Sequence, residues 1–474
     1  RRSKTAWTLM AKRPKKLMGE ELMSWAQTPI TRSYPSGYPT VNAEPTDSRR
    51  LWSNHEGAKL IFRLSNLVPM LVAISMVIPV TLVGTFRLGE ILVLALYPFY
   101  FKHIAKALRN REVLFLFSLA TLWFCSQLLS DIYNGSTTKN LLRGLGSIVL
   151  TMTTFVFFCG LYARDYRNHL GAVLGASAGG LLSASLIYRF DRGNQSYAEN
   201  LWDFYVSGWA HPAFALLSFL LFRKHPWILF PVGIVYAVLA NIYGGRSDGL
   251  IVLISTLFFF YLWIQPSKSG VNLRGAMRKG FILSSVLLVP MYFMYVSFAQ
   301  AGTLGKSAKI QIDLAKNPYN PVEVLLLARN ESLIALDAIY EKPLLGHGSW
   351  ANPGHLRRLY LLKMREIYGS KAPKQIFQDI LPVHSVLLGA WVFGGFAGFV
   401  FWAYVIYRTF YLANRLLLGA SLAMIALVVV YLPYFSWHVM FSPNSFARFS
   451  WPLHMAFLIF ADAYWTQRRV DTNQ

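Results

Sequence analysis

Apolar stretches of membrane-spanning length constrain the fold of this chain more than any other feature. A helix needs about 20 apolar residues to cross the hydrocarbon layer of a bilayer. Such stretches occur near residues 65–86, 88–102, 112–130, 143–162, 168–188, 205–222, 226–242, 248–265, 280–299, 383–408, 412–434 and 446–466. The chain is 54% hydrophobic and only 14% charged, whereas a soluble domain of this size carries far more charge. The sequence therefore predicts an all-α polytopic membrane protein with about twelve transmembrane helices.

The distribution of Lys and Arg over the short loops predicts the orientation of these helices. Lys and Arg favour the cytoplasmic loops of a membrane protein. With the N-terminus in the cytoplasm, the basic loops fall on that side, at 102–111, 164–167, 223–225, 268–279, 408–415 and 468–469. The expected order is a cytoplasmic tail (1–60), nine helices (61–300), one long external loop (301–381), three helices (382–466) and a second cytoplasmic tail (467–474).

The formal net charge of +24 follows from these basic loops and from the tail, and it requires no nucleic acid partner. Residues 1–60 are basic and rich in Pro, Ser and Thr, which predicts a largely disordered tail attracted to membrane lipids of negative charge. A plain solvated tail is the alternative. The tail lacks the apolar core of a signal peptide, so the first apolar stretch is expected to direct insertion. The two cysteines, Cys125 and Cys159, lie in apolar stretches, and their spacing fits neither a disulfide framework nor a metal site.

The external loop carries two stretches with helical periodicity. The first begins at Asn320 to Glu323, where Asn caps the helix, Pro fits the first turn and Glu reaches back as in a capping box. Its apolar stripe ends before Lys342, and a turn bracketed by glycines follows at 344–348. A second amphipathic helix is expected from His355 to Tyr368, with basic residues on one face, namely Arg357, Arg358, Lys363 and Arg365. Both helices are expected to lie on the outer membrane face.

Three side chains in or beside this loop are candidates for chemistry on an anion. Arg246 follows two glycines, which allow close backbone approach, and its guanidinium can bind phosphate oxygens bidentately. The alternative is an arginine that snorkels to the membrane interface. Arg329 lies on the first loop helix, where the alternative is a surface arginine paired with a nearby Glu. His384 lies where the chain re-enters the membrane, and a neutral imidazole there can act as a general base, although a structural histidine is the commoner case.

Other basic side chains expected on the same side are weaker candidates for substrate contact. These are Arg143, Arg189, Arg192, His211 and Arg448. His347, in the glycine turn, is a further candidate for substrate contact and competes with His384 for the role of base.

The chain resembles the superfamily of O-antigen ligases and Wzy-type O-antigen polymerases, which are bacterial envelope glycosyltransferases. The resemblance covers roughly residues 65–466 and rests on three elements in the family's order around a large periplasmic loop. They are Gly-Gly-Arg-Ser at 244–247, the run from Arg329 to Pro-Leu-Leu-Gly-His-Gly at 343–348, and His-Ser-Val-Leu-Leu-Gly-Ala at 384–390 with Gly-Gly-Phe-Ala-Gly at 394–398. The family often has Asn after the histidine, where this chain has Ser385. The resemblance implies a GT-C-like fold with the large loop between the ninth and tenth helices.

The resemblance also implies an activity. A glycan would be transferred from undecaprenyl pyrophosphate to an acceptor hydroxyl, with inversion, at the periplasmic face of the bacterial inner membrane. Arg246 and Arg329 would bind the pyrophosphate, and His384 would remove or orient the acceptor proton. No cofactor or metal is expected, because no Asp-X-Asp element with a convincing metal context occurs on the outer side. The acceptor stays open between another lipid-linked glycan, for a polymerase, and lipid A-core, for a ligase; the basic tail slightly favours a polymerase.

A transporter or flippase of lipid-linked oligosaccharide is the alternative from another class. Such a carrier needs polar or ionisable residues deep within several helices. The middles of these stretches are mostly Leu, Val, Phe, Ile and Ala, and their ionisable groups collect near the ends. A structural scaffold, the third possibility, gives no reason for the Gly-Gly-Arg element to face the same side as the loop. The sequence therefore favours an enzyme.

Overall fold

Helices make up nearly all of the described structure, as the apolar stretches predict. The computed structural model describes residues 64–81, 85–190, 202–222, 224–264, 273–304, 306–329, 331–368, 381, 383–417, 420–442 and 444–473, all within the unit Asn54–Gln474. Among these residues, seven helices are long and apolar enough to cross a membrane, and two shorter apolar helices accompany them. The prediction of an all-α membrane protein is therefore confirmed. The predicted tail 1–60 lies outside the described residues.

The seven membrane-length helices are α4 (Leu88–Leu108), α5 (Arg111–Tyr133), α6 (Thr138–Arg164), α7 (Asn168–Phe190), α11 (Arg246–Ile264), α17 (Val386–Leu417) and α18 (Leu422–Phe441). The two shorter ones are α9 (Ser207–Leu221), which follows a π-helical turn at Trp202–Val206, and α10 (Pro226–Ile242). Two long helices run beside them: α12 (Leu273–Gln300) against α11, and α19 (Asn444–Asn473) against α6 and α17. Residues 467–473, predicted as a tail, continue α19.

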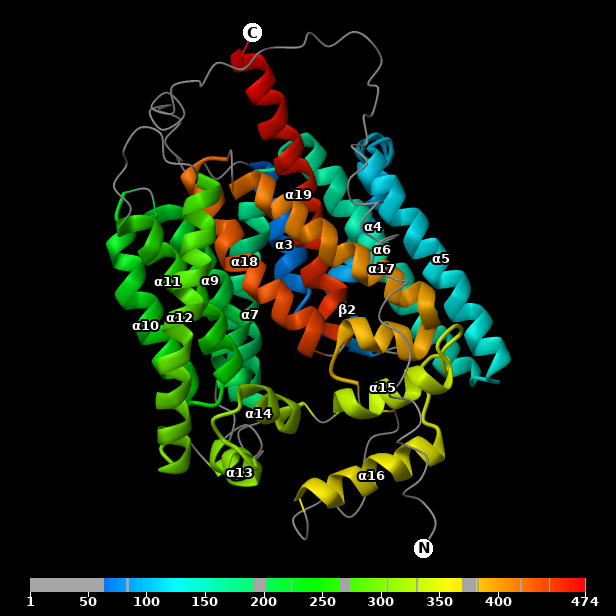
Figure 1. Ribbon diagram of the computed structural model, residues 1–474. Coiled ribbons are helices and arrows are strands. Elements are labelled where there is room, and N and C mark those ends of the chain that lie inside the picture. The colour runs from blue at the N-terminus through cyan, green and yellow to red at the C-terminus, as the bar shows by residue number, and fades with distance from the viewer. Residues whose placement is uncertain are drawn as a thin grey trace, which may run out of the picture. The chain divides into compact units, whose positions relative to one another are not determined.

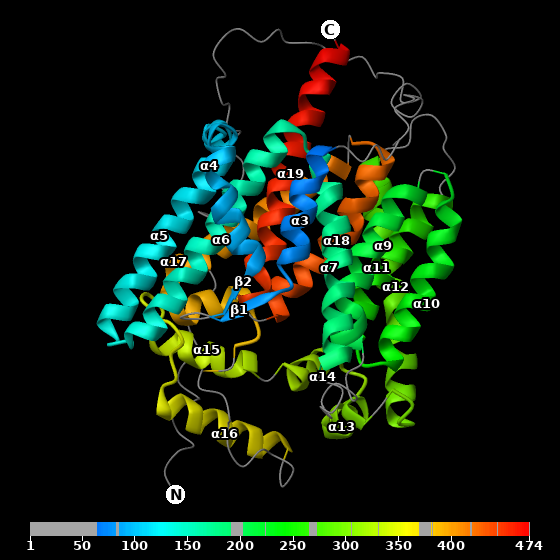
Figure 2. The same ribbon diagram turned by 180° about the vertical axis from the view of Figure 1, so that it is seen from behind.

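Four shorter helices of the external loop gather at one end of the long helices (Figures 1 and 2). They are α13 (Lys306–Leu314), α14 (Pro321–Ala328), α15 (Glu331–Glu341) and α16 (Gly354–Tyr368). We call this the loop end. It also holds the turns after α5 and α10 and the start of α17. The opposite end holds the basic turns after α4, α6 and α9 and the ends of α17 and α19, and we call it the basic end. The structure thus separates the loop from the basic turns, as the charge distribution predicts.

The first predicted span, 65–86, is not one continuous helix. After a 3₁₀ turn, the chain forms α3 (Leu67–Ser75) and then two short antiparallel strands, β1 (Pro79–Thr81) and β2 (Thr85–Arg87). Pro79 has no backbone N–H to continue a helical ladder, and the β-branched residues beside it favour strands. The hairpin turns the chain back, so that α4 packs beside α3.

The first predicted loop helix is two helices in the structure. α14 ends before Arg329, and α15 begins at Glu331, so Arg329 lies in the connection and not on a helix. Asn320 caps α14 as predicted, because its side chain accepts from the N–H groups of Val322 and Glu323. The second predicted loop helix is confirmed as α16, whose buried side chains pack against α15.

α17 is broken near the loop end. Gly395 has φ 69° and ψ −162°, a backbone conformation that glycine adopts without a steric penalty. The glycine turn of the external loop covers the carbonyl groups at this break. His347 N–H donates to the Val392 carbonyl at 2.7 Å, and Gly348 N–H donates to the Phe393 carbonyl at 3.1 Å. The loop therefore completes the hydrogen bonding of a membrane-length helix.

Polar side chains of α5 form hydrogen bonds with the break in α17 and with the residue that follows the glycine turn. The Ser126 hydroxyl donates to the Gly394 carbonyl at 2.8 Å, and Gln127 Nε2 donates to the Ser349 hydroxyl at 3.0 Å. Asp131 accepts from both the backbone N–H and the hydroxyl of Ser349. We call the assembly of the break, the glycine turn and these α5 side chains the loop junction.

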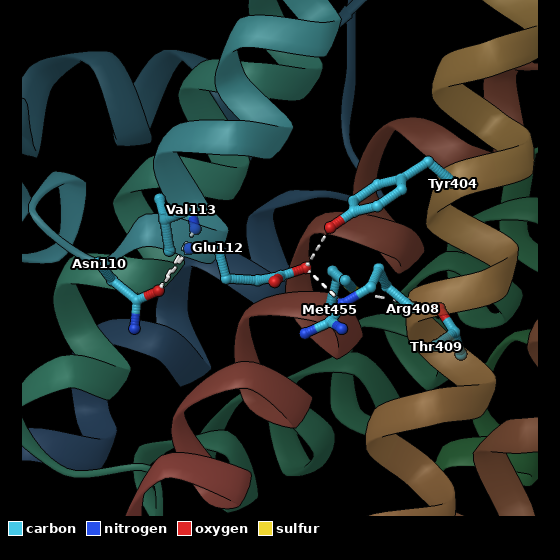
Figure 3. Close-up of polar contacts among 7 residues, drawn as sticks. All are labelled: Asn110, Glu112, Val113, Tyr404, Arg408, Thr409 and Met455. Carbon is cyan, nitrogen blue, oxygen red and sulfur yellow. Dashed lines mark hydrogen bonds and ion pairs between the residues drawn. The ribbon is translucent and has the colours of Figure 1, made fainter. Parts of the chain in front are cut away.

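α5 is also fastened to α17 at the basic end (Figure 3). Glu112, in the first turn of α5, accepts from Arg408 Nε at 2.6 Å and from the Tyr404 hydroxyl at 3.2 Å. Asn110 caps the same turn by accepting from the N–H groups of Glu112 and Val113. The two helices are therefore tied together at both ends, which gives the loop junction a rigid base.

Candidate functional site

Arg329, Glu331 and His384 form a cluster at the loop end. His384 precedes α17, and its Nδ1 lies 3.3 Å from Glu331 Oε1. Glu331 opens α15, a position that favours an acidic side chain, and the charge of Arg329 acts on its carboxylate. The His384 side chain is 37% exposed and the Glu331 side chain 17%, so the imidazole stays accessible while the carboxylate is covered. Glu331 thus lies between Arg329 and His384, two of the three candidates predicted from the sequence. The sequence analysis gave Glu331 no role in the site.

The pKa of Glu331 lies below its ordinary value. Burial acts to raise this pKa, but the hydrogen bonds from His384 and from its own backbone N–H, with the charges of His384 and Arg329, outweigh burial. An ionised carboxylate can only accept hydrogen bonds, so Nδ1 of His384 must carry a proton. The carboxylate therefore orients the imidazole through Nδ1 and leaves Nε2 outside this contact.

Ser385 fixes the backbone beside His384. Its hydroxyl accepts from the Leu388 N–H at 3.2 Å and donates to the Val439 carbonyl at 3.3 Å. The first of these bonds caps α17, and the second ties its start to α18. Asn is an equally good helix cap. The serine in this chain therefore serves a local structural role that an asparagine can also fill.

Arg246 begins α11 at the loop end. Its Nη1 donates to the Tyr295 hydroxyl of α12 at 3.2 Å and to Gln311 Oε1 of α13 at 3.0 Å, and both acceptors are neutral. Gly245 before it is required by packing, because a Cβ there would lie 1.9 Å from Trp202 Cδ1. These contacts fix Arg246 against α12 and α13, whereas His384 contacts Glu331 at the start of α15, just after Arg329.

Two weaker candidates belong to the loop junction. His347 is buried, and its Nε2 lies 2.9 Å from the Ala338 carbonyl of α15. Burial lowers the pKa of His347, so the ring is a neutral donor to that carbonyl near pH 7. The Arg143 guanidinium of α6 lies 5.4 Å from the centre of the Trp350 ring, in a cation–π contact. Both side chains position the glycine turn.

Arg448 forms an ion pair between helices. Its Nη2 lies 2.6 and 2.7 Å from the two carboxylate oxygens of Glu90, which is 2% exposed. The pair joins α19 to the start of α4. Arg189 lies near the end of α7, and its side chain is outside the described part of the chain; Arg192 lies outside the described residues.

A row of titratable rings runs through the helices, and we call it the histidine column. Its members are His169, His211, His438, His454, Tyr162, Tyr431 and Tyr434. His211 is 2% exposed and stacks on Tyr434 with 4.0 Å between ring centres. It is therefore an interior residue and not a surface contact. Single histidines within apolar stretches carry no periodic signal, so sequence analysis missed the column.

These features define a multi-pass, α-helical membrane protein with a carboxylate–imidazole pair and an arginine at the end covered by the external loop. Within the described residues, no group of three or more His, Cys, Asp or Glu side chains is placed to hold a metal ion. Comparison of the chain with protein-family models, with curated proteins and with solved structures found no match.

Proposed function

We propose that this chain is a membrane glycosyltransferase of the O-antigen polymerase or ligase type. It transfers a glycan from undecaprenyl pyrophosphate to an acceptor hydroxyl, with inversion and without a metal. The observation that carries the proposal is the cluster at the loop end, where a proton acceptor, the carboxylate that orients it and an arginine meet. The order of the three sequence elements around the loop supports the same assignment.

The reaction follows from the proposed roles. His384 Nε2 takes the proton of the acceptor hydroxyl while its oxygen attacks the anomeric carbon from the face opposite the pyrophosphate. The new C–O bond forms as the anomeric carbon–phosphate oxygen bond breaks, and the electron pair leaves with the pyrophosphate. Arg246 and Arg329 bind this leaving group and stabilise its growing charge. Glu331 stabilises the imidazolium that forms, because a carboxylate favours the charged ring.

The proposal includes a membrane arrangement. The chain crosses the bacterial inner membrane twelve times in a GT-C-like fold, with the loop end facing the periplasm and the basic end facing the cytoplasm. The gathering of basic turns at one end supports this orientation. The proposed acceptor is another lipid-linked glycan or lipid A-core.

Glycan analysis of a deletion strain separates the two acceptors. Single repeats on lipid A-core identify a polymerase, because ligation continues without polymerisation. Long polymer that accumulates on undecaprenyl pyrophosphate identifies a ligase. Normal glycans on both carriers contradict the proposed function.

A transporter or flippase of lipid-linked oligosaccharide is the second candidate, and the histidine column favours it. A carrier places ionisable residues deep within its helices, and His169, His211 and His454 lie in the interior. Purified protein in detergent micelles with a lipid-linked donor and an acceptor decides between the two. An enzyme forms the glycosidic product there, whereas a carrier has no compartments to connect and forms none.

A further inference from the structure

We propose that the histidine column is a proton path through the helices, from the basic end to the cluster at the loop end. The inference rests on His and Tyr side chains that the transfer reaction does not use, and only the loop-end terminus of the path is shared with the proposed site. Ionisable side chains inside a membrane are costly and mark functional sites, and histidine chains serve as proton relays in membrane proteins. An imidazole suits this task because it can accept a proton at one nitrogen and release one from the other.

The column begins near the basic end. Tyr162 lies in the last turn of α6 and His169 in the first turn of α7, and the Tyr162 hydroxyl lies 3.3 Å from His169 Nδ1. The ring of His169 is 5.7 Å from that of His454 on α19 and 5.5 Å from that of Tyr431 on α18, measured between ring centres. Tyr431 and His454 are 4.0 Å apart. Four helices thus contribute to the first half of the column.

The second half continues to the loop end. The Tyr434 ring lies 6.5 Å from His454, 4.0 Å from His211 of α9 and 4.3 Å from His438. His438 lies in the last turn of α18, and its Nδ1 is 2.6 Å from the Ser442 hydroxyl. The charge of Arg329 acts electrostatically on His438 and on Glu331. The column therefore ends at the loop end, on the same side of the helices as the His384 cluster.

Unused hydrogen-bonding capacity inside the column supports this role. Three buried ring nitrogens have no protein hydrogen-bond partner among the described residues. They are both nitrogens of His211 and Nε2 of His169, and both residues are at least 98% buried. Buried polar groups normally find partners, since leaving them without one is costly. The proposed path uses these nitrogens to accept and release protons.

The charged groups around the column are few among the described residues. Asp248, in the first turn of α11, is buried and acts electrostatically on Tyr434. The positive charge of Arg329 acts electrostatically on His438, the histidine at the loop end. The histidines of the column also act electrostatically on one another. The column thus has one acidic group and one basic group near the loop end, and uncharged rings along the rest of its length.

Proton flux into vesicles tests the path directly. Full-length protein is reconstituted into vesicles of phosphatidylethanolamine and phosphatidylglycerol with an entrapped pH-sensitive dye, and valinomycin with a potassium gradient sets the driving potential. Wild type is expected to admit protons faster than protein-free vesicles. His454→Gln, which keeps hydrogen bonding but does not titrate near pH 7, is expected to fall to the protein-free rate. His225→Gln is the matched control, because His225 is exposed at the start of α10 and outside the column.

Two results overturn the path: wild-type flux equal to that of protein-free vesicles, or full flux in both His454→Gln and His169→Gln. If His454→Gln does not elute as a folded monodisperse protein, His169→Gln decides by the same criterion. Glycan transfer in micelles, where no gradient exists, measures the proposed enzyme activity separately. The two proposals can therefore fail independently.

Discussion

At the scale of single residues, polar contacts fix the guanidinium of Arg246. Its Nη1 donates to oxygens of Tyr295 and Gln311 on two neighbouring helices. These contacts orient the planar group against α12 and α13. The side chain is only half-buried.

Replacement of Arg246 by Lys tests whether donor binding needs the planar geometry of the guanidinium or only its positive charge. Lysine keeps the charge but loses the planar fork that matches phosphate oxygens. Arg246→Lys and Arg329→Ala are each expected to lower glycan transfer by about 10²–10³-fold with normal membrane expression. Arg358→Ala is the control, because Arg358 lies on the exposed face of α16. This variant is expected to lower glycan transfer only slightly. Wild-type transfer by Arg246→Ala would contradict the role in donor binding.

Replacement of His384 tests the proposed base. His384→Ala is expected to lower turnover by about 10²–10⁴-fold while donor binding persists, because the pyrophosphate contacts belong to the arginines. Glu331→Gln should also lower turnover, but less, because the imidazole loses the carboxylate that orients it. Wild-type turnover in Glu331→Gln would remove Glu331 from the mechanism.

The sequence predicted Arg329 and His384 but could not predict what joins them. Arg329 and Glu331 are neighbours in the chain, so a nearby Glu was expected only as a surface partner. Glu331 and His384 are far apart in the chain, because most of α15, the glycine turn and the whole of α16 lie between them. Their contact depends on how α15 packs against α17, which periodicity does not encode.

At the scale of elements, the loop junction brings the external loop into close backbone contact with the long helices. A Cβ on Gly395 would lie 2.0 Å from the Leu344 carbonyl oxygen, and a Cβ on Gly346 would lie 2.7 Å from the Val392 carbonyl oxygen. Both glycines also have positive φ. The turn and the break in α17 can therefore meet only if both positions are glycine.

Gly395→Ala is expected to loosen the junction. The substitution adds about 1–3 kcal/mol of backbone strain in this nearly glycine-only conformation, and the overlap with the Leu344 carbonyl adds to this. A lower melting temperature and faster protease cleavage within 343–350 are the expected readouts. Gly146→Ala is the control, because no atom lies within 4 Å of a Cβ at that helical position. Equal melting temperatures for the two variants would contradict the docking described for the turn.

The docking of the glycine turn is expected to weaken in acid. Burial lowers the pKa of His347 below its ordinary value of 6.5, although the Ala338 carbonyl and Glu341 act in the opposite direction. The released turn therefore binds a proton that the docked turn does not. The stability of the docked turn is therefore fully present above pH 6.5, and it is lost as the pH falls through the lowered pKa of His347.

Hydrogen exchange of the amides at 343–350, corrected for the intrinsic effect of pH, measures this change. His347→Gln keeps a donor for the Ala338 carbonyl but does not titrate, so it should show no acid weakening. Identical pH dependence in wild type and His347→Gln would assign the effect to another group.

The elements were predictable to different degrees. The cap at Asn320, the glycine turn and α16 follow local sequence rules, and the structure confirms them. The break at Gly395 was not predicted, because the surrounding stretch is uniformly apolar. It is stabilised by Ser126, which is 268 positions away in the chain, and no local signal marks such a pair.

At the scale of the whole molecule, the long helices form a layer with the loop helices at one end and the basic turns at the other (Figures 1 and 2). The apolar stretches predicted most of this arrangement, since length and composition decide whether a segment can cross a membrane. They did not predict the hairpin after α3 or the histidine column. The hairpin follows from Pro79 and the β-branched residues beside it, whereas the histidine column depends on packing between helices distant in sequence.

Labelling of single cysteines tests the orientation of this layer. In a background lacking Cys125 and Cys159, a cysteine at Arg358 of α16 should react with an impermeant reagent from the periplasm. A cysteine at Lys224, between α9 and α10, should react only after the membrane is permeabilised. Both native side chains are exposed. The reverse pattern would place the proposed site on the cytoplasmic side, away from the periplasmic donor.

The break in α17 has a consequence for biogenesis. The Val392 carbonyl receives its hydrogen bond from the backbone of the glycine turn, which lies earlier in the chain. The Phe393 carbonyl accepts from the same turn and also from Gln127 and Ser130 of α5. A bilayer interior offers no water to replace those donors. A newly synthesised α17 therefore enters the lipid incomplete, and it reaches its final form only after the preceding loop has folded back onto it. Assembly of the last helices thus depends on the loop, and a chain shortened within 343–350 is expected to be cleared by quality-control proteases even though its apolar stretches are unchanged.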